Sequence, residues 1–362
     1  MKLGLFLAIG ESLKDFESKG QLKRLINYNV KKYSLSFEEV YIFSYRDEDF
    51  KLPPNCYLVT NKYHLHRYLY SLLMPILNYS VIKECDVLRG LQLTGGIPAF
   101  VSKLLLGKKF VINYGYDYSD FASIEGKPLQ SILYLFIQSP ILKLADSIIV
   151  PSKTIYERLK KKYGVKVVHI ANGVDTNLFH PASPKTNKKI IDVVFIGRLE
   201  RQKNLDSLIK AVKNINEPYT MTFYGNGSEQ ANLSKLAENL KTPLQIKAPI
   251  DYEEVAKVLR SCDIFVLPSH KEGSPKILLE AMASGCAIVA SNVSQITEII
   301  KNGETGILCS QDSQDIERAL RELLDLKKRQ QLGKNARKLI QDNYEINKLL
   351  SKEIDMLKNL SR

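Results

Sequence analysis

Two glutamates in the segment "HKEGSPKILLEAMASGCAIVAS" (270–291) are the first residues that suggest chemistry. Glu272 and Glu280 lie eight positions apart, on either side of a Gly-Ser-Pro turn, and Glu280 is surrounded by apolar residues. Eight helical residues span roughly 12 Å at about 1.5 Å each. Paired glycosidase carboxyls lie only roughly 5–9.5 Å apart. The spacing therefore favours two ligands of one extended substrate over an acid/base pair.

The residues around the turn predict a capped helix that starts beside Glu272. Ser274 is expected as the N-cap and Pro275 as the first helical residue, with Gly285 at the C-terminal cap. The free N–H groups and the dipole of such a helix suit a phosphate. Inside the helix, Glu280 needs hydrogen-bond donors. A ribose diol and a neighbouring lysine are both suitable, and the choice stays open.

A second basic and glycine-containing segment, "VVFIGRLERQKNL" (193–205), follows the same plan. Gly197 comes just after a predicted strand, and Arg198 and Lys203 lie in and beyond the following turn. An Arg/Lys pair at the end of a strand suits a diphosphate. In isolation the two residues fit solvated surface charges better. "FYGNGSEQ" (223–230) adds a Gly-x-Gly turn, which is weak evidence by itself.

The elements that must position these residues alternate along the chain. Short apolar runs rich in β-formers alternate with segments of helical period, and the pattern restarts after the polar stretch "HPASPKTNKK" (180–189). This alternation predicts an α/β protein with two doubly wound parallel sheets, in residues 1–183 and 184–340. Ligands bind at the carboxyl ends of strands in such folds, so facing domains would share a crevice there.

Three segments of the first domain are candidates to line the side of a second substrate. They are "FLAIGES" (6–12), which contains Gly10, "GLQLTGGIP" (90–98) and "NYGYDYSDF" (113–121). No G-x-G-x-x-G follows the first strand, which counts against a dinucleotide dehydrogenase.

Two further segments each have a structural and a functional interpretation. "RDED" (46–49) has the Asp47-x-Asp49 spacing of some metal sites, but a solvated loop is favoured because no other motif points to it. "NKYHLHRYLYSLLMPILNY" (61–79) mixes basic, aromatic and aliphatic residues. It fits a membrane-interface helix, and an ordinary amphipathic core helix is preferred.

Bulk composition bounds the class of protein and its partners. The 362 residues are 44% hydrophobic and 25% charged, and the net charge of +13 favours anionic partners such as phosphates, acidic polymers or a lipid surface. Nucleic acid is disfavoured because no recognition motif accompanies the dispersed basic residues. Five cysteines without metal-site spacing fit reduced, buried thiols. No signal peptide or membrane span is evident, so we expect a cytoplasmic chain.

Together, the motifs resemble a known enzyme family. "EGSPKILLEAMASG" is similar to the E-x7-E block of the retaining glycosyltransferases of family GT4. "ADSIIVPS", "VVHIANGVDTNLFHP", "VVFIGRLERQKNL", "FYGNG", "CDIFVLPS" and "EIIKNGETGILCS" follow in that family's order, over about residues 145–310. The resemblance implies the GT-B fold, with two facing Rossmann-like domains, an inter-domain cleft and a final helix (341–362) that crosses back onto the first domain.

The resemblance also implies roles for the residues singled out above. Arg198 and Lys203 would hold the donor diphosphate, Glu272 would contact the transferred sugar, and Glu280 would bind the nucleotide ribose. Of these four residues, Glu272, Arg198 and Lys203 are the catalytic candidates. The donor site as a whole would comprise Gly197, Arg198, Lys203, Glu272, Gly273, Ser274, Pro275, Lys276 and Glu280.

The first domain departs from the family pattern. Many relatives carry a His-Gly pair after the strand that corresponds to "KFVINYG", with the histidine near the reacting sugar. Here the pair is Tyr114-Gly115, with Asp117 close by, and the opening loop lacks a double glycine. Gly10, Tyr114, Gly115 and Asp117 are therefore the candidates for the acceptor side.

The expected activity is transfer of a hexose-type sugar from a UDP- or GDP-sugar to a hydroxyl acceptor, with retention. The acceptor would be a glycolipid, a lipid-linked saccharide or a polysaccharide. No metal or other cofactor is expected, and the net charge suits peripheral association with the inner face of the cell membrane. Two alternatives stay open: a non-catalytic subunit that binds a nucleotide sugar or a membrane, and another enzyme on the same fold, such as a sugar-nucleotide epimerase or a phosphorylase.

Overall fold

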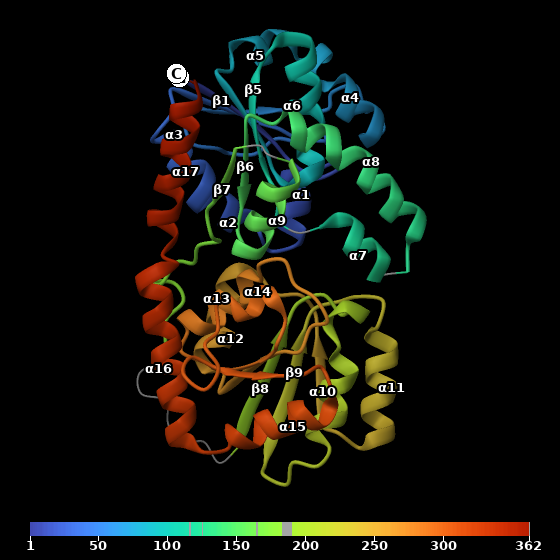
Figure 1. Cartoon of the computed structure of the whole chain (residues 1–362), viewed down its shortest axis with the longest axis vertical. Coiled ribbons are helices and arrows are strands. Elements are labelled where there is room, and N and C mark those ends of the chain that lie inside the picture. The colour runs from blue at the N-terminus through green and yellow to red at the C-terminus, as the bar shows by residue number, and fades with distance from the viewer. Residues whose placement is uncertain (116, 125, 164–165, 183–189, 362) are drawn as a thin grey trace. The chain divides into compact units, whose positions relative to one another are not determined.

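The computed structural model describes residues 1–115, 117–124, 126–163, 166–182 and 190–361. The chain divides into two compact units. Unit 1 comprises Met1–Ala171 and Asn347–Arg362, and unit 2 comprises Asn172–Ile346 (Figure 1).

Unit 1 is built on a parallel sheet in the order β3-β2-β1-β4-β5-β6-β7. Its strands are β1 Lys2–Phe6, β2 Glu39–Phe43, β3 Cys56–Val59, β4 Val87–Gly90, β5 Lys109–Asn113, β6 Ser147–Val150 and β7 Val167–His169. Its helices are α1 Leu13–Ser18, α2 Leu22–Arg24, the π-helix η1 Leu25–Val30, α3 Lys31–Ser34, α4 Arg67–Leu77, α5 Tyr79–Glu84, α6 Gln92–Leu106, α7 Tyr118–Ile124, α8 Pro128–Leu144, α9 Lys153–Tyr163 and α17 Ile346–Ser361.

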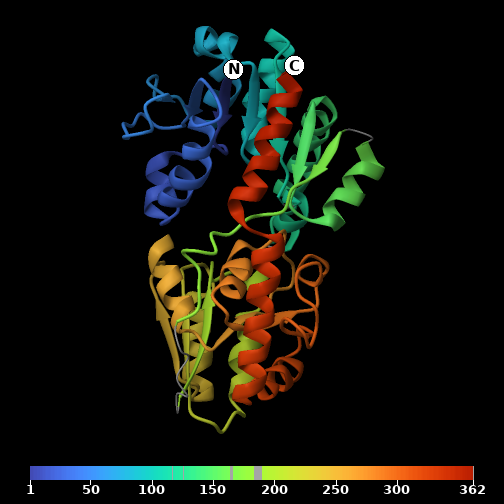
Figure 2. The ribbon, with the colours of Figure 1, turned by 90° about the vertical axis from the view of Figure 1, so that its left-hand side faces the viewer.

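Helices cover both faces of this sheet because alternate strand residues point to opposite sides. In β1, Leu3 and Leu5 join a core with helices η1, α3 and α17, whereas Phe6 joins a second core with α4, α6 and α8. Leu349, Ile354 and Leu357 anchor α17 in the first of these cores. Figure 2 shows this helix, in red, running along the sheet of unit 1.

Unit 2 is built on a second parallel sheet, in the order β10-β9-β8-β11-β12-β13. Its strands are β8 Ile191–Ile196, β9 Tyr219–Tyr224, β10 Leu244–Lys247, β11 Ile264–Leu267, β12 Ala287–Ser291 and β13 Ile307–Cys309. Its helices are the 3-10 helix η2 Arg201–Lys203, α10 Leu205–Val212, α11 Gln230–Leu240, α12 Tyr252–Ser261, α13 Lys276–Ala283, α14 Ser294–Thr297, α15 Ser313–Glu322 and α16 Leu326–Asn343. The predicted pair of doubly wound α/β domains is thus confirmed.

The boundaries of the units differ from the predicted ones. The chain passes from unit 1 to unit 2 at Ala171/Asn172 rather than at 183/184, and it returns at 346/347 rather than at 340/341. The reason is that residues 172–182 bond to unit 2: the Val174 N–H donates to the Tyr344 carbonyl (2.9 Å), and the Phe179 and Tyr252 rings lie 5.1 Å apart. Most of the predicted linker, residues 183–189, lies outside the described residues.

No helix within the described residues has the length and apolar character needed to cross a bilayer.

Candidate functional site

Two of the predicted site residues form an ion pair in unit 2. Lys203 ends η2, just after β8, and Glu272 lies in the loop that follows β11. The Lys203 Nζ is 2.6 Å from the Glu272 Oε1, and the two side chains are only 14% and 6% exposed. The pairing follows from the topology, because β8 and β11 are adjacent parallel strands whose carboxyl ends lie at the same edge of the sheet.

A neighbouring hydroxyl, which the sequence motifs did not indicate, completes the surroundings of Glu272. The Ser269 Oγ donates to the Glu272 Oε1 at 2.6 Å, and the Ser291 Oγ at the end of β12 donates to the Ser269 carbonyl at 2.6 Å. The carboxylate is therefore fixed by an ammonium and a hydroxyl, both within its own unit. Such a fixed acceptor is suited to orienting the hydroxyls of a sugar.

The η2 segment and the loop after β11 are tied together by further bonds. The buried Gln202 donates from its side-chain Nε2 to the Lys271 carbonyl at 2.7 Å, and its main-chain carbonyl accepts from the His270 N–H at 2.8 Å. Asn204, in the left-handed region at φ 54°, donates from its Nδ2 to the Pro268 and Gln311 carbonyls at 3.1 and 2.9 Å. These contacts fix the positions of Lys203 and Glu272 relative to each other.

Arg198 lies in a tight turn that packs against the Gly-x-Gly turn of residues 225–227. The Leu199 N–H donates to the Asn226 carbonyl at 2.8 Å, so the turn of residues 197–199 lies directly against the Gly-x-Gly turn. A Cβ on Gly225 would lie 1.9 Å from the Gly197 carbonyl oxygen, and one on Gly227 would lie 2.3 Å from the Leu199 carbonyl oxygen. The "FYGNG" segment therefore has a definite role, which is to let two backbones approach. Arg198 itself is exposed.

The helix after Glu272 starts later than predicted. α13 begins at Lys276, with Pro275 in the N-cap position and no side-chain cap, so the predicted Ser274 N-cap is wrong. Proline has no side-chain acceptor, and Ser274 is held instead by its carbonyl, which accepts from the Asn172 Nδ2 at 2.9 Å. Gly285 follows the helix in the left-handed region at φ 70°, as its expected capping place requires.

The remaining predicted donor residues surround the start of α13. Gly273 is buried in the loop, Lys276 is exposed in the first helical turn, and Glu280 is buried one turn further on. The N–H groups at this helix start retain their suitability for an anion. The alternative partners of Glu280, a ribose and a lysine, remain predictions.

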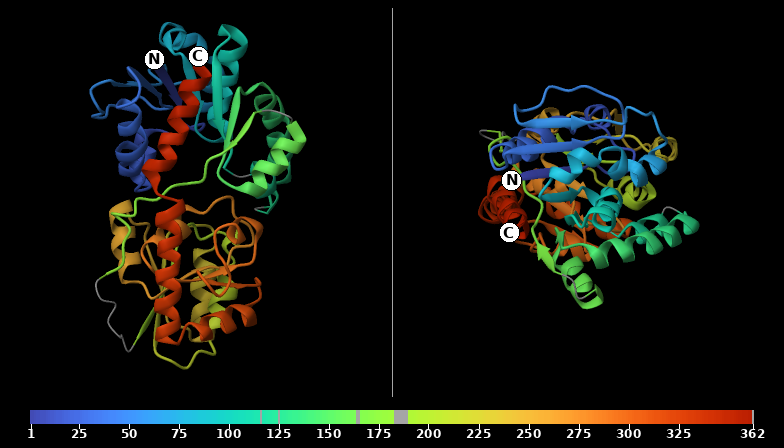
Figure 3. Two further views of the ribbon diagram at one scale, coloured as in Figure 1. Left: turned by 60° about the vertical axis from the view of Figure 1, so that its left-hand side comes forward. Right: turned by 90° about the horizontal axis from the view of Figure 1, so that it is seen from above.

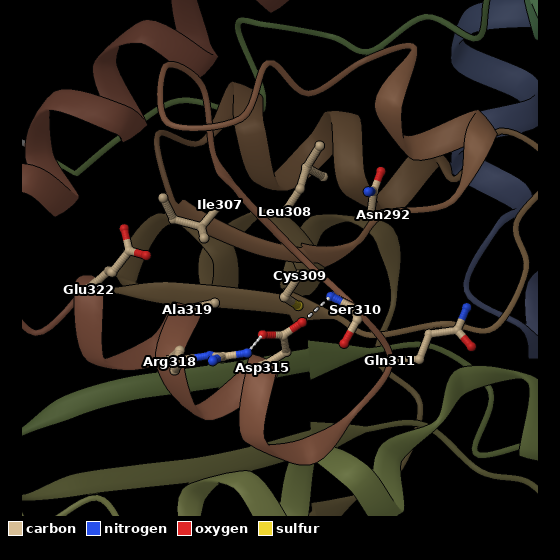
Figure 4. Close-up of a pocket in the computed structure, with 10 residues that line it drawn as sticks. All are labelled: Asn292, Ile307, Leu308, Cys309, Ser310, Gln311, Asp315, Arg318, Ala319 and Glu322. Atoms are coloured by element: carbon tan, nitrogen blue, oxygen red, sulfur yellow. Dashed lines mark hydrogen bonds and ion pairs between the residues drawn. The ribbon is translucent and has the colours of Figure 1, made fainter.

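A cavity of about 630 Å³ lies at the β13 edge of unit 2, beside this loop (Figure 4). Its lining includes Gln311, Asp315 and Arg318, and none of the predicted donor residues. The Gln311 Nε2 donates to the His270 carbonyl at 3.2 Å, so one wall of the cavity contacts the loop of Glu272. Hydrogen bonds from Ser310 and the ion pair with Arg318 lower the pKa of Asp315.

The acceptor-side candidates of unit 1 differ in what they offer. Tyr114 is only 1% exposed, and its hydroxyl donates to the Gln138 Oε1 at 3.0 Å in α8. Burial raises the pKa of Tyr114. The expectation that its side chain lines an acceptor site is therefore corrected, because its ring belongs to the core. Asp117 is held by an ion pair with Arg158 at 2.9 Å.

Backbone strain marks one residue that the sequence did not single out. Gln92 follows β4 at φ 61°, and it presents its Oε1 to the Tyr118 hydroxyl (3.4 Å). A Cβ on Gly115 would lie 3.5 Å from the same oxygen, and Gly10 adopts φ 73° beside Arg67. Strain of this kind often occurs at binding sites. Gly10, Gly115 and Asp117 stay candidates, and Gln92 joins them.

The "RDED" segment has a structural role that belongs to its middle glutamate. The Glu48 carboxylate accepts from the Leu13 and Lys14 N–H groups (2.8 and 3.0 Å) and so caps α1, while Asp47 accepts from the Thr60 hydroxyl at 2.9 Å. Within the described part of the chain, no group of three His, Cys, Asp or Glu residues could hold a metal ion. Independence from metal stays a prediction.

Unit 2 contains a segment that is similar to a known protein family. Residues 177–339 match the family described as glycosyl transferases group 1. This match contains β8, η2, the loop of Glu272 and α13. Among curated relatives of this chain is glycogen synthase of Mycobacterium tuberculosis, 27% identical over 198 residues. That alignment covers 52% of this chain and 48% of the relative, so the chain matches about half of its length.

Solved structures resemble the whole chain. Sucrose-phosphate synthase from Thermosynechococcus elongatus superposes with a TM-score of 0.84 over 99% of both chains, at 17% identity. Anabaena HepE, solved with UDP and glucose, superposes with a TM-score of 0.78 over 99% of this chain and 100% of its own, at 16% identity. These similarities confirm the predicted GT-B fold.

Proposed function

We propose that the chain is a retaining GT4 glycosyltransferase that moves a hexose-type sugar from a UDP- or GDP-sugar to a hydroxyl acceptor. The observation that carries the proposal is the buried Lys203–Glu272 pair, fixed beside the start of α13 within the group 1 segment. The solved neighbour that holds UDP and glucose supports a nucleotide-sugar donor. Glycolipids, lipid-linked saccharides and polysaccharides are the proposed acceptors.

Charge at the leaving group is the main demand of this reaction. As the bond between the sugar carbon and the diphosphate breaks, negative charge grows on the phosphate oxygens. Lys203, Arg198 and the N–H groups at the start of α13 would neutralise that charge in place of a metal ion. The acceptor oxygen forms the new bond to the sugar carbon, and its proton passes to the departing phosphate.

The two glutamates of the E-x7-E motif would then bind different parts of the donor. Glu272 already accepts from Lys203 and Ser269, which suits it to position sugar hydroxyls rather than to act as a free base. Glu280 would accept from the ribose diol. The net charge of +13 favours an anionic acceptor, and an acceptor at the inner face of the cell membrane is included in the proposal.

A thermal-shift panel of nucleoside diphosphates and nucleotide sugars tests donor binding separately from the acceptor. We expect one nucleotide to raise the melting temperature of the wild type, and Glu280→Gln to reduce this shift. No shift with any nucleotide would contradict the proposal. Binding without transfer to any acceptor would favour a non-catalytic subunit. Release of the nucleoside diphosphate without a glycosylated product would favour an epimerase.

A further inference from the structure

Large apolar side chains are distributed very unevenly over the surface. In the described part of unit 2, Ile190 is the single large apolar side chain with high exposure, whereas unit 1 carries many. Most of these belong to three helices, α4, α6 and α8. Exposed apolar side chains gathered in one place usually mark an interaction surface.

Helix α8 carries an apolar stripe on its outer side. Its inner side buries Ile141 and Leu142 in the core with α4 and α6. Its outer residues recur at helical spacing and remain exposed, up to 83% for the first of them: Leu129, Ile132, Leu133 and Phe136. Figures 1 and 3 show α8 at the periphery of unit 1.

Helices α4 and α6 continue this surface. α6 packs against both α4 and α8, and all three cover the same face of the sheet. α4 buries Tyr70 and Met74 and exposes its opposite side, and α6 exposes its C-terminal end. The exposed residues are Leu69, Leu72, Ile76, Leu104 and Leu105. We call the outer sides of α4, α6 and α8 the outer helix face.

The charged residues within these three helices are basic, and one of them, Lys103, pairs with Asp146 just beyond the end of α8. α4, α6 and α8 contain no aspartate or glutamate, and their charged residues are Arg67, Lys103 and Lys143. Lys62 and Lys127 lie exposed just before α4 and α8. Exposed tyrosines lie before, within and after α4: Tyr63, Tyr68 and Tyr79. Surfaces that combine apolar, basic and aromatic side chains are typical of the boundary between headgroups and acyl chains.

We propose that the outer helix face is a docking surface for an anionic membrane. The apolar side chains would enter the acyl boundary, and the basic residues would contact headgroup phosphates. The inference deepens the proposed function and rests on it in one respect, because an enzyme docked on the membrane would encounter a lipid-linked acceptor there. A second copy fits this face less well, because pairing would bring like charges together in a chain of net charge +13.

Vesicle co-sedimentation of the purified full chain tests the surface. We expect the protein to pellet with vesicles of phosphatidylcholine that contain about one third phosphatidylglycerol, and much less with phosphatidylcholine alone. Leu133→Glu combined with Phe136→Glu should weaken partitioning at least about tenfold, because it places two carboxylates in the contact. Both residues are exposed, so folding should tolerate the change.

A matched control separates this face from general apolar exposure. Leu35 directly follows α3 in the same unit and is 78% exposed. α3 packs in the core on the opposite face of the sheet, away from α4, α6 and α8. The variant Leu35→Glu should therefore bind vesicles like the wild type. In a second pair, Lys127→Gln with Lys143→Gln should weaken binding to anionic vesicles, whereas Lys334→Gln in unit 2 should not.

Three results would overturn the proposal. They are absence of the wild type from the anionic pellet, equal loss in Leu35→Glu, and a dimer in light scattering that Leu133→Glu dissociates. The assay contains neither donor nor acceptor, so it is independent of glycosyl transfer. Vesicle binding by a protein that transfers no sugar would leave the docking surface standing and would contradict only the proposed function.

Discussion

At the scale of single residues, the proposed function depends most on the pair Lys203–Glu272. We expect Lys203→Met and Glu272→Gln each to lower sugar transfer by about a hundredfold or more, because each removes a group aimed at the charge or hydroxyls of the donor. Turnover by the purified variants measures this effect. Circular dichroism melts are needed alongside, since each change leaves a partner without its ion pair.

The matched control for this prediction is another lysine of unit 2. Lys210 pairs with Asp206 at 3.1 Å on α10, and both side chains are half exposed. Lys210→Met should therefore leave transfer unchanged. Ordinary turnover in Lys203→Met or Glu272→Gln would refute the assignment of this site.

Residue types near strand ends were readable from the sequence, but their partners were not. Lys203 and Glu272 could be singled out because each follows an apolar run. Ser269, Gln202 and Asn204 were missed, although each bonds to the loop of Glu272. The bonds of Gln202 and Asn204 cross 69 and 64 positions, so only the packing of β8 beside β11 brings them together.

The cysteines give a residue-scale prediction about pH. Burial raises the pKa of Cys56 to about 11 and that of Cys85 and Cys309 to about 12, from an ordinary value of 9.0. A raised thiol pKa stabilises the fold below the pKa of the unfolded thiol, and this stability is lost as pH rises from about 9 towards about 12. Melting temperatures measured across this range should therefore fall.

Thiol reactivity provides an independent check of the same burial. All five cysteines are free and buried. Ellman's reagent at neutral pH should react slowly with the native chain and rapidly with the chain unfolded in guanidinium. A thiol of the native protein that reacts at the unfolded rate would contradict this picture.

At the scale of elements, α17 is tied to the sheet of unit 1 by a buried ion pair. The Arg89 Nε on β4 is 2.6 Å from the Glu353 Oε1, its Nη2 donates to the Oε2 at 3.0 Å, and the Tyr33 hydroxyl also bonds to Glu353. Removal of one partner leaves a buried charge, which costs roughly 3–5 kcal/mol. We therefore expect Glu353→Gln to destabilise unit 1 by about that amount.

Hydrogen exchange of the β4 amides measures the effect in the full chain. The double variant Arg89→Met, Glu353→Leu should lose less protection than Glu353→Gln alone, because it leaves no unpaired charge. The control is Lys103→Met, which breaks the partly exposed pair with Asp146 and should cost about 1 kcal/mol or less. Equal losses in all three proteins would contradict a special role for the pair.

Elements with strong periodicity were predicted, whereas less regular ones were not. β1, β8 and β11 are apolar runs buried on both faces, and they were recognised. The edge strand β3 was missed, because only one of its four residues is fully buried and its apolar run is correspondingly weak. α8 was also missed. It is apolar on its inner and outer sides, so its sequence lacks the polar stripe that marks an ordinary surface helix.

At the scale of the whole molecule, the sequence pattern predicted two domains, but it placed the first boundary too late, at 183/184 instead of 171/172, and the second too early, at 340/341 instead of 346/347. A polar, proline-containing stretch around residue 183 is a good sign of exposed chain. The unit boundary depends instead on where backbone bonds lie, and Val174 bonds to Tyr344 and Ile346. A Cβ on Gly173 would lie 2.6 Å from the Ile346 Cα, so both crossings between the units occur in adjacent, closely packed chain segments.

This arrangement makes unit 1 dependent on the end of the chain. A protein that stops at residue 346 lacks Leu349, Ile354 and Leu357, each of which contributes roughly 1.5–3 kcal/mol by burial, and it leaves Arg89 unpaired. These losses approach the roughly 5–15 kcal/mol that stabilises a typical domain. We therefore expect unit 1 to lose hydrogen-exchange protection, whereas β8 and β11 of unit 2 keep theirs. A donor nucleotide should still raise the melting temperature of unit 2.

The matched control for this truncation lacks only residues 361 and 362, and it should behave as the full chain, because the three buried anchors of α17 remain. Protection retained throughout unit 1 without residues 347–362 would show that α17 is a peripheral attachment. Loss of protection in both units would show that they unfold as one cooperative structure. Selective loss in unit 1 would establish that its fold is completed by a helix that follows unit 2 in the chain.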